Sequence, residues 1–217
     1  MKIDFVSDIA CPWCAVGLNS LERALEKLQD EIPVELHFHP FELNPAMVAE
    51  GVDSGDYLRE KYGMSVEQLA KNRLELRARG AAVGFQFAAT GASPRVWNTF
   101  DAHRLLFWAQ LQSPELQRKL KHAFLNAYHG EGQNPSDPTL MLALAEQAGL
   151  DAAGALAVIY SDLYGNEVRA EESYWQQAGI QSVPSIIINQ KHLITGGQPP
   201  EVFERVLREI AAEATSG

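Results

Sequence analysis

The sequence predicts an α/β fold in which a large all-helical segment interrupts a smaller β-containing part. Short β-type runs occur only near the two ends of the chain, at residues 2–6, 33–39 and 183–196. Helical patterns dominate the stretch between about residue 56 and residue 177. Together these observations give the order β-α-β, a long helical block, then α-β-β-α.

The first unit begins with KIDFV, a mostly apolar run typical of a strand. Pro12 follows where a helix could begin, because proline suits the first helical position, whose N–H has no partner. Leucines at spacings of three and four then predict an amphipathic helix to about Gln29. In PVELHFH, residues 33–39, apolar and polar residues alternate, which predicts a second strand.

The central block starts with a short helix in DYLREKYG and a longer one capped by Ser65, which we expect to be interrupted near Gly80. A helix over 96–111 is apolar almost all round and should be buried on several faces. The block should therefore pack on the β-containing part. One more helix, within residues 160–179, ends at Gly179.

The last unit starts with the isoleucine-rich run VPSIIIN, which predicts a buried strand. A tight turn at Asn189-Gln190 leads to a second strand, KHLITG, and PPEVFERVLREI follows as an amphipathic helix. We divide the chain into a β-containing domain, residues 1–43 and 159–217, and a helical insertion, residues 44–158.

Composition and charge exclude several classes of function. Hydrophobic residues make up 46% and charged residues 21% of the 217 residues, which is ordinary for a globular protein. The formal net charge is −10, so neither nucleic acid nor an anionic membrane is an expected partner. No apolar run is long enough to span a bilayer and no secretory signal is evident, so we expect a cytoplasmic protein.

The chain has only two cysteines, and they form the motif CPWC at residues 11–14. Pro12 keeps Cys11 out of the helical conformation, which places Cys11 at the helix tip. Unpaired N–H groups and the helix dipole favour the thiolate there. Cys14 lies one turn further in, within reach of a mixed disulfide formed at Cys11. Trp13 would shield the pair and offer an apolar contact to substrate.

Half of a zinc site is the alternative interpretation of this motif. Zinc normally takes four ligands, and the sequence has no second Cys-X-X-Cys. The nearest spare ligands are His37 and His39, on one face of the 33–39 strand. We therefore expect redox chemistry, with no bound metal and no bound cofactor.

Taken together, the motifs resemble a known family. A strand, CPWC, a helix, a helical insertion and a strand opened by SVP resemble the DsbA-like oxidoreductases of the thioredoxin fold. The stretches DFVSDIACPWCAVG, PFELNP, NTFDAHRLL and AYHGEG resemble the FrnE-type branch in order and spacing. The resemblance covers essentially the whole chain and implies a thioredoxin-like fold with a large helical insertion. It also implies that Pro184 is a cis-proline facing the disulfide, with Val183 lending its backbone to an extended substrate.

Relatives on the same fold include the kappa-class glutathione transferases and the 2-hydroxychromene-2-carboxylate isomerases. These usually carry serine where this chain has Cys11, which counts against their chemistry here. The resemblance implies thiol or disulfide substrates, protein or small molecule. Glutathione and a second copy of the chain are further candidate partners.

Two polar residues of the 96–111 helix, Asn98 and His103, are candidates for lining the active-site cleft. For each residue the other interpretation is structural. His103 would be a hydrogen-bonded core histidine, and Asn98 would form structural hydrogen bonds near the start of the helix. Asn98 would lie on a different face from His103. Of the two acids flanking the active strand, Asp4 is better placed than Asp8 to accept the proton of the buried cysteine. The alternative interpretation of Asp4 is a solvated acid at the edge of the strand.

Three functions are open at this point. The first, which the sequence favours, is a thiol–disulfide oxidoreductase or isomerase in which Cys11 is the nucleophile and Cys14 the resolving cysteine. Val183 and Pro184 would form its substrate dock. The second is a glutathione-dependent transferase or isomerase on the same fold. The third is a non-enzymatic zinc- or peptide-binding module.

Overall fold

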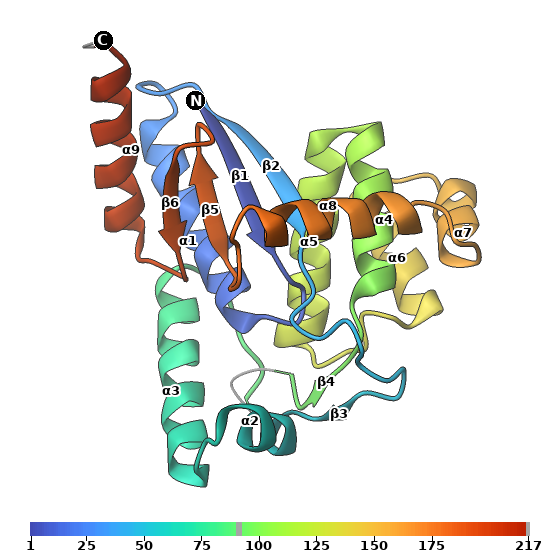
Figure 1. The fold of residues 1–217 in the computed structure, drawn as a ribbon. Coiled ribbons are helices and arrows are strands. Elements are labelled where there is room, and N and C mark those ends of the chain that lie inside the picture. The colour runs from blue at the N-terminus through green and yellow to red at the C-terminus, as the bar shows by residue number, and fades with distance from the viewer. Residues whose placement is uncertain (90–92, 216–217) are drawn as a thin grey trace.

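A four-stranded mixed sheet organises the computed structural model, which describes residues 1–89 and 93–215 (Figure 1). β1 (Lys2–Ser7) pairs in parallel with β2 (Glu35–Pro40) and antiparallel with β5 (Ser185–Ile188). β6 (His192–Thr195) follows β5 at the edge, which gives the order β2-β1-β5-β6. Parallel neighbours need a crossover connection, and α1 (Pro12–Leu28) supplies it between β1 and β2.

Helices cover both faces of this sheet. On one face Phe5 packs with α1 and with α9 (Pro200–Thr215). On the other face Val6 packs with Trp175 of α8 (Gly165–Gln177). Burying side chains of this size contributes about 1.5–3 kcal/mol each. The alternation of side chains along β1 therefore decides which helix each residue meets.

The segment between β2 and α8 is mainly helical, as the sequence predicts. In chain order its helices are α2 (Ser54–Tyr62), α3 (Val66–Ala82), α4 (Phe100–Gln112), α5 (Pro114–Leu125), a π-helix (Asn126–Gly130), α6 (Pro138–Ala148) and α7 (Ala152–Ile159). α4 to α7 share one apolar core, which Ile9 joins from the loop after β1. α2 and α3 lie away from that core, beyond the start of α1 (Figure 1).

The helix predicted over 96–111 begins later than expected. α4 starts at Phe100, and Arg95–Val96 instead forms β4, antiparallel to β3 (Val52–Asp53). The Oδ1 of Asn98 accepts a hydrogen bond from the N–H of Phe100 at 2.9 Å, which satisfies one free donor at the helix start. A two-residue ribbon has no periodicity, so the sequence pattern does not reveal it.

Two other expectations about helix limits were wrong. Gly80 does not interrupt α3; a Cβ there would lie 2.6 Å from the ring of Phe87, so the glycine serves close packing. The helix that ends before Gly179 starts only at Gly165, because Tyr164 has a φ of 64° and leaves the right-handed helical region.

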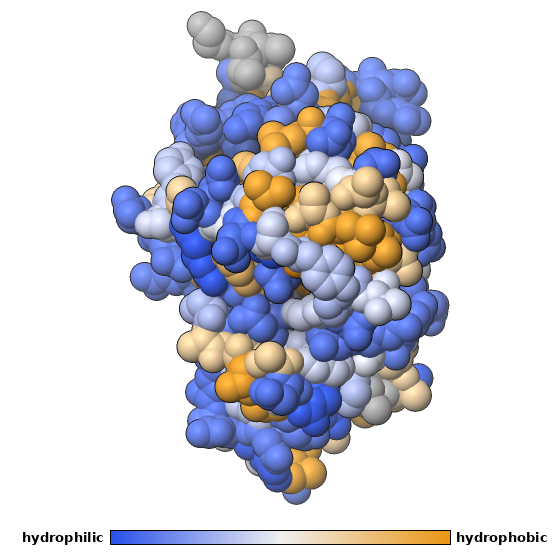
Figure 2. Space-filling model, turned by 90° about the vertical axis from the view of Figure 1, so that its right-hand side faces the viewer, coloured by the Kyte–Doolittle hydropathy of each residue, from blue (hydrophilic) through white to orange (hydrophobic). Residues whose placement is uncertain are grey.

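The face drawn in Figure 2 carries scattered apolar patches among polar side chains. Exposed apolar side chains of the helical segment include Leu111, Leu156, Tyr160 and Leu163. Within the part of the chain that the structure describes, no helix is long and apolar enough to cross a bilayer. The domain limits at residues 43/44 and 158/159 stay predictions.

Arg104 of α4 should be important for stability. It is buried, and its Nη1 donates to the carbonyl oxygens of Val158, Ser161 and Leu163 at 2.9, 2.8 and 2.8 Å. In Arg104→Met these carbonyls lose their common donor, so we expect the free energy of unfolding to fall by about 3 kcal/mol. Urea unfolding followed by circular dichroism measures this. Arg205→Met, exposed on α9, is the control and should stay within about 0.5 kcal/mol of wild type.

An unfolding midpoint of Arg104→Met equal to that of the wild type would contradict this role.

Candidate active site

Cys11 stands at the N-cap of α1, just after the loop that leaves β1. Its backbone is extended (φ −90°, ψ 111°) and Pro12 takes the first helical position. No acidic residue occupies the first turn. The N–H groups and dipole of the helix tip therefore act on the Cys11 sulfur without a carboxylate in that turn to oppose them.

Cys14 lies one turn further along the helix and is fully buried. Both cysteines are free thiols. Burial raises the pKa of Cys14 well above its usual range, and the hydrogen bond and charge of Cys11 raise it further. The Lys121 ammonium opposes this shift only in part. Cys14 is thus held as a protonated thiol behind Cys11.

The loop before β5 faces Cys11. Its Val183–Pro184 peptide bond is cis, as the resemblance implied. The Sγ of Cys11 donates to the carbonyl oxygen of Val183 at 3.5 Å. Gly17 lets α1 approach this loop, because a Cβ at that position would lie 2.9 Å from the Cγ of Pro184. The first cysteine and the Val-Pro pair, distant in sequence, are therefore neighbours.

A cleft of about 480 Å³ opens beside Cys11. Of the predicted site residues, Cys11, Pro12, Trp13 and Val183 line it. The other walls come from the helical segment and the ribbon, and include Tyr57, Tyr62, Leu69, Leu76, Val96 and Tyr128. A space of this size accepts a small molecule or a few side chains of a peptide.

Helix α3 helps to hold Trp13 at this cleft. The guanidinium carbon of Arg79 lies 5.8 Å from the centre of the Trp13 ring, within cation–π distance. Its Nη2 also donates to the carbonyl oxygen of Gly197 at 2.5 Å. Gly197 packs against Trp13 in turn, since a Cβ there would lie 3.1 Å from the Trp13 carbonyl oxygen.

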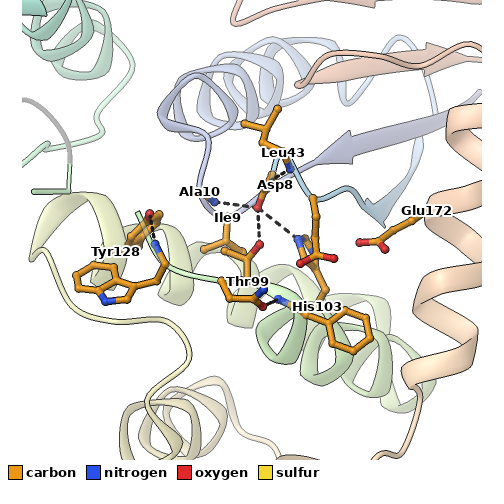
Figure 3. Close-up of polar contacts among 12 residues, drawn as sticks. Asp8, Ile9, Ala10, Leu43, Thr99, His103, Tyr128 and Glu172 are labelled. Atoms are coloured by element: carbon orange, nitrogen blue, oxygen red, sulfur yellow. Dashed lines mark hydrogen bonds and ion pairs between the residues drawn. The ribbon is translucent and has the colours of Figure 1, made fainter. Parts of the chain in front are cut away.

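The carboxylate of Asp8 organises the loop before Cys11 (Figure 3). It accepts hydrogen bonds from the N–H of Ala10 at 3.0 Å, the N–H of Leu43 at 2.7 Å and the hydroxyl of Thr99 at 2.8 Å. His103 Nε2 lies 3.5 Å away. Burial opposes ionisation, but His103 and these N–H groups outweigh it and lower the pKa of Asp8.

Neither Asn98 nor His103 lines the cleft beside Cys11. His103 is buried next to Asp8, which agrees with the core placement of the alternative interpretation. Its Nε2, 3.5 Å from the Asp8 carboxylate, has no hydrogen-bond partner among the described residues. Asn98 donates through Nδ2 to the carbonyl oxygen of Met47 at 3.3 Å and caps the start of α4. The contacts of both side chains help to hold α4 in place. For both residues, a role in substrate binding stays a prediction that no described contact supports.

Asp4 was the wrong choice for a proton acceptor. It points to the α8 face of the sheet, because it alternates with Phe5 along β1. There its Oδ1 lies 2.8 Å from both His39 Nε2 and Lys2 Nζ. Burial opposes ionisation, but these two partners outweigh it and lower the pKa of Asp4. Among the described residues no three His, Cys, Asp or Glu side chains form a group that could hold a metal ion.

Two buried basic residues near the dithiol escaped the sequence analysis. Lys121 of α5 is 1% exposed; burial lowers its pKa to about 8, although the charges of Cys14 and Asp8 oppose this.

His129 of the π-helix lines the cleft, and its Nε2 lies 2.8 Å from the carbonyl oxygen of Ile9. Burial lowers the pKa of His129 to about 4. The π-helix is the feature that points to this stretch, AYHGEG, because π-helices are frequent at functional sites. The sequence pattern did not reveal it.

Gly17 should be needed for the contact between α1 and the cis-proline loop. A methyl group there overlaps Pro184, so we expect Gly17→Ala to lower the free energy of unfolding by about 1–3 kcal/mol. Gly165→Ala is the control: its nearest neighbouring atoms would be 3.8 Å away, so better helix propensity should leave stability equal or higher. Urea unfolding compares them, and equal stability of Gly17→Ala and wild type would refute the close contact.

Lys121 should make stability depend on alkaline pH. Its folded-state pKa of about 8 is below the ordinary value of about 10.4, so the unfolded state binds more protons between these values. The penalty for burying the charge is full below pH 8 and disappears above 10.4. We therefore expect the wild type to gain about 3 kcal/mol of stability relative to Lys121→Met as pH rises from about 7 to 10.5.

Urea unfolding at a series of pH values tests this. Lys119→Met removes an exposed lysine of the same helix and should show no such slope relative to wild type. A flat difference between wild type and Lys121→Met would contradict the buried charge.

Comparisons with known proteins show the family and the fold. A family model described as a DSBA-like thioredoxin domain matches residues 2–208. The crystal structure of a probable DsbA oxidoreductase from Streptomyces coelicolor is 34% identical, with a TM-score of 0.90, over 98% of this chain and 91% of that chain.

Two more distant structures share the fold. One is 2-hydroxychromene-2-carboxylate isomerase, 16% identical with a TM-score of 0.71, over 100% of this chain and 98% of that chain. The other is the cytosolic disulfide reductase DsbM from Pseudomonas aeruginosa with GSH, 16% identical with a TM-score of 0.66, over 98% of this chain and 100% of that chain. The expected thioredoxin-like fold with a helical insertion is thus confirmed, and the chain belongs to the DSBA-like thioredoxin domain family.

Proposed function

We propose that this protein is a thiol–disulfide oxidoreductase or isomerase that exchanges disulfides through Cys11 and Cys14. The observation that carries the proposal is the asymmetry of the two thiols. Cys11, 6% exposed, lies at a helix tip and lines a cleft, whereas Cys14 is fully buried behind it and has a raised pKa. Membership in the DSBA-like family supports an oxidoreductase role in general.

In the proposed reduction, the Cys11 thiolate attacks one sulfur of the substrate disulfide. The substrate S–S bond breaks, one substrate thiolate leaves and takes up a proton, and a mixed disulfide forms at Cys11. Cys14 then loses its proton and attacks the Cys11 sulfur, which releases the second substrate thiolate. Two electrons pass to the substrate, and the protein ends with a Cys11–Cys14 disulfide. Oxidation of a substrate follows the same steps in reverse.

Several groups assist these steps. The Lys121 ammonium favours the Cys14 thiolate that must form before resolution, because it lowers the pKa against the effect of burial. The carbonyl oxygen of Val183, already in contact with Cys11, would receive an N–H from an extended substrate. Pro184 presents no N–H to compete with the substrate there.

The second candidate function is a glutathione-dependent transferase or isomerase. What favours it is likeness of fold to the 2-hydroxychromene-2-carboxylate isomerase and to DsbM, which was solved with GSH. We keep glutathione as a candidate redox partner and a cytoplasmic location as part of the proposal, because DsbM is described as a cytosolic reductase. A homodimer and a zinc- or peptide-binding module stay predictions.

Reduction of insulin disulfides by the protein in a glutathione buffer tests the proposal. We expect Cys11→Ser to abolish the activity, because it removes the nucleophile. Cys14→Ser keeps the nucleophile and should accumulate a mixed disulfide at Cys11, visible by mass spectrometry as one substrate thiol per chain. Cys14→Ser is the matched control for Cys11→Ser, because each variant replaces one cysteine by serine and the two differ only in which cysteine is replaced. Glutathione conjugation that survives in Cys11→Ser would instead favour the second candidate.

A further inference from the structure

The cleft beside Cys11 has the character of a small-molecule site. Its volume of about 480 Å³ falls within the roughly 300–1,000 Å³ of such sites. Apolar and aromatic side chains dominate the walls formed by α2, α3 and the connection between them: Tyr57, Leu58, Tyr62, Met64, Leu69 and Leu76. Ser54, Asn72 and Arg73 are the polar exceptions on these walls. The apolar majority favours a compact ligand that is mainly apolar, because polar groups facing it would lack hydrogen-bonding partners.

The described lining of the cleft is positively charged, and one of its two arginines is held by hydrogen bonds to the backbone. The described residues that line it include Arg73 and Arg95 but no Asp or Glu. Arg95 is already engaged, because its Nη2 donates to the carbonyl oxygens of Glu50 and Gly51, both at 2.9 Å. His129 is neutral at pH 7, since burial lowers its pKa to about 4. Arg73 is left as the free cation of the described lining.

Arg73 is partly buried on α3 and forms no hydrogen bond or ion pair within residues 1–89 and 93–215. Its Nη2 lies beside the first turn of α2, where a Cβ on Gly55 would be 3.7 Å away. Asp53 of that turn makes no ion pair with Arg73 and accepts the N–H of Asp56 at 2.9 Å as the helix cap. A partly desolvated guanidinium without a partner attracts a carboxylate, which it can bind with two hydrogen bonds.

We propose that this cleft binds a small apolar disulfide that carries a carboxylate, with the carboxylate on Arg73 and the S–S bond at Cys11. The proposal rests on the exchange chemistry above and names its substrate class. Glutathione disulfide matches the cleft less well, because each half also carries an ammonium group. The described lining offers no carboxylate to pair with that group.

Such a ligand would react in the same two steps as the substrate disulfide of the proposed function, with atoms and electrons balanced in the same way. Cys11 attacks one sulfur, the ligand S–S bond breaks, and one ligand thiolate leaves. Cys14 gives up its proton to solvent and attacks Cys11, which releases the second ligand thiolate and closes the protein disulfide. Each protein molecule therefore releases two ligand thiols and passes two electrons to the ligand.

Two aromatic disulfides of similar size separate charge recognition from thiol reactivity. Dithiobis(nitrobenzoate) carries a carboxylate on each ring, whereas dithiodipyridine carries none. Both release a thiol that absorbs strongly, so the rate constant with the reduced full-length protein is read from absorbance at pH 7. Each rate is divided by that of dithiothreitol with the same disulfide. Glutathione disulfide releases no absorbing thiol, so its rate is followed by mass spectrometry of the reduced and oxidised protein and is divided in the same way.

We expect Arg73→Gln to slow the reaction with dithiobis(nitrobenzoate) about tenfold and to leave that with dithiodipyridine unchanged. Arg73→Lys should keep part of the rate, because it retains the charge but not the planar fork. Lys71→Gln, which removes an exposed charge from the same helix outside the cleft, should change neither rate. A general change in thiolate reactivity would affect both disulfides alike, so the ratio of the two rates isolates recognition.

Equal rates for Arg73→Gln and wild type, or an equal loss with both aromatic disulfides, would overturn the proposed ligand class and leave the exchange function standing. A higher normalised rate with glutathione disulfide than with dithiobis(nitrobenzoate) would also overturn it. If the reduced protein reacts with none of the three disulfides faster than a free thiol does, the exchange function itself fails, and this proposal with it.

Discussion

The buried carboxylate of Asp8 is the interaction on which the rest of the site depends. It joins three segments that are far apart in the sequence: the loop before Cys11, the chain leaving β2 at Leu43 and the start of α4 at Thr99 (Figure 3). A buried charge is tolerated only when its oxygens are hydrogen-bonded, and here they are. Any movement of the loop would leave that charge unpaired, so the helix tip is held in one place.

This arrangement places charges of both signs around the dithiol. Asp8 lies on the side of the loop and Lys121 of α5 on the side of Cys14, and both are buried. The lysine favours the Cys14 thiolate, while burial and the neighbouring Cys11 oppose it. Cys14 is therefore kept protonated, and in the proposed exchange the Lys121 ammonium would favour its ionisation. The helical segment contributes that cation, which the sheet and α1 do not provide.

The helical segment also determines what reaches Cys11. Helix α3 holds Trp13 through Arg79 and presents Arg73 to the cleft about 1.7 turns earlier. The π-helix brings Tyr128 and His129 to the other wall. In the proposed function, the thioredoxin-like part would supply the exchange chemistry, while the helical segment would supply the shape and charge that select the partner. When the reacting residues and the residues that shape the cleft come from different parts of a fold, the same fold can carry several activities.

The sequence by itself determined the features that depend on neighbouring residues. The strand, Pro12 at the first helical position and the leucine spacing place Cys11 at a helix tip, because each is a local preference of the backbone or a repeat along one helix. The order of elements was also readable from periodicity. The cis form of the Val183–Pro184 bond came only from the resemblance, since cis is rare even before proline.

Only the tertiary structure decided which distant side chains share the site. Lys121 occurs in an amphipathic helix, where a lysine is normally exposed, and nothing local indicates that α5 buries it beside Cys14. His103 was a candidate for the cleft or for the core, and packing places it in the core beside Asp8. Asp4 could have been excluded, because alternation along β1 turns it away from α1. Contacts between elements depend on how whole faces pack together, and a pattern read along one element does not contain that information.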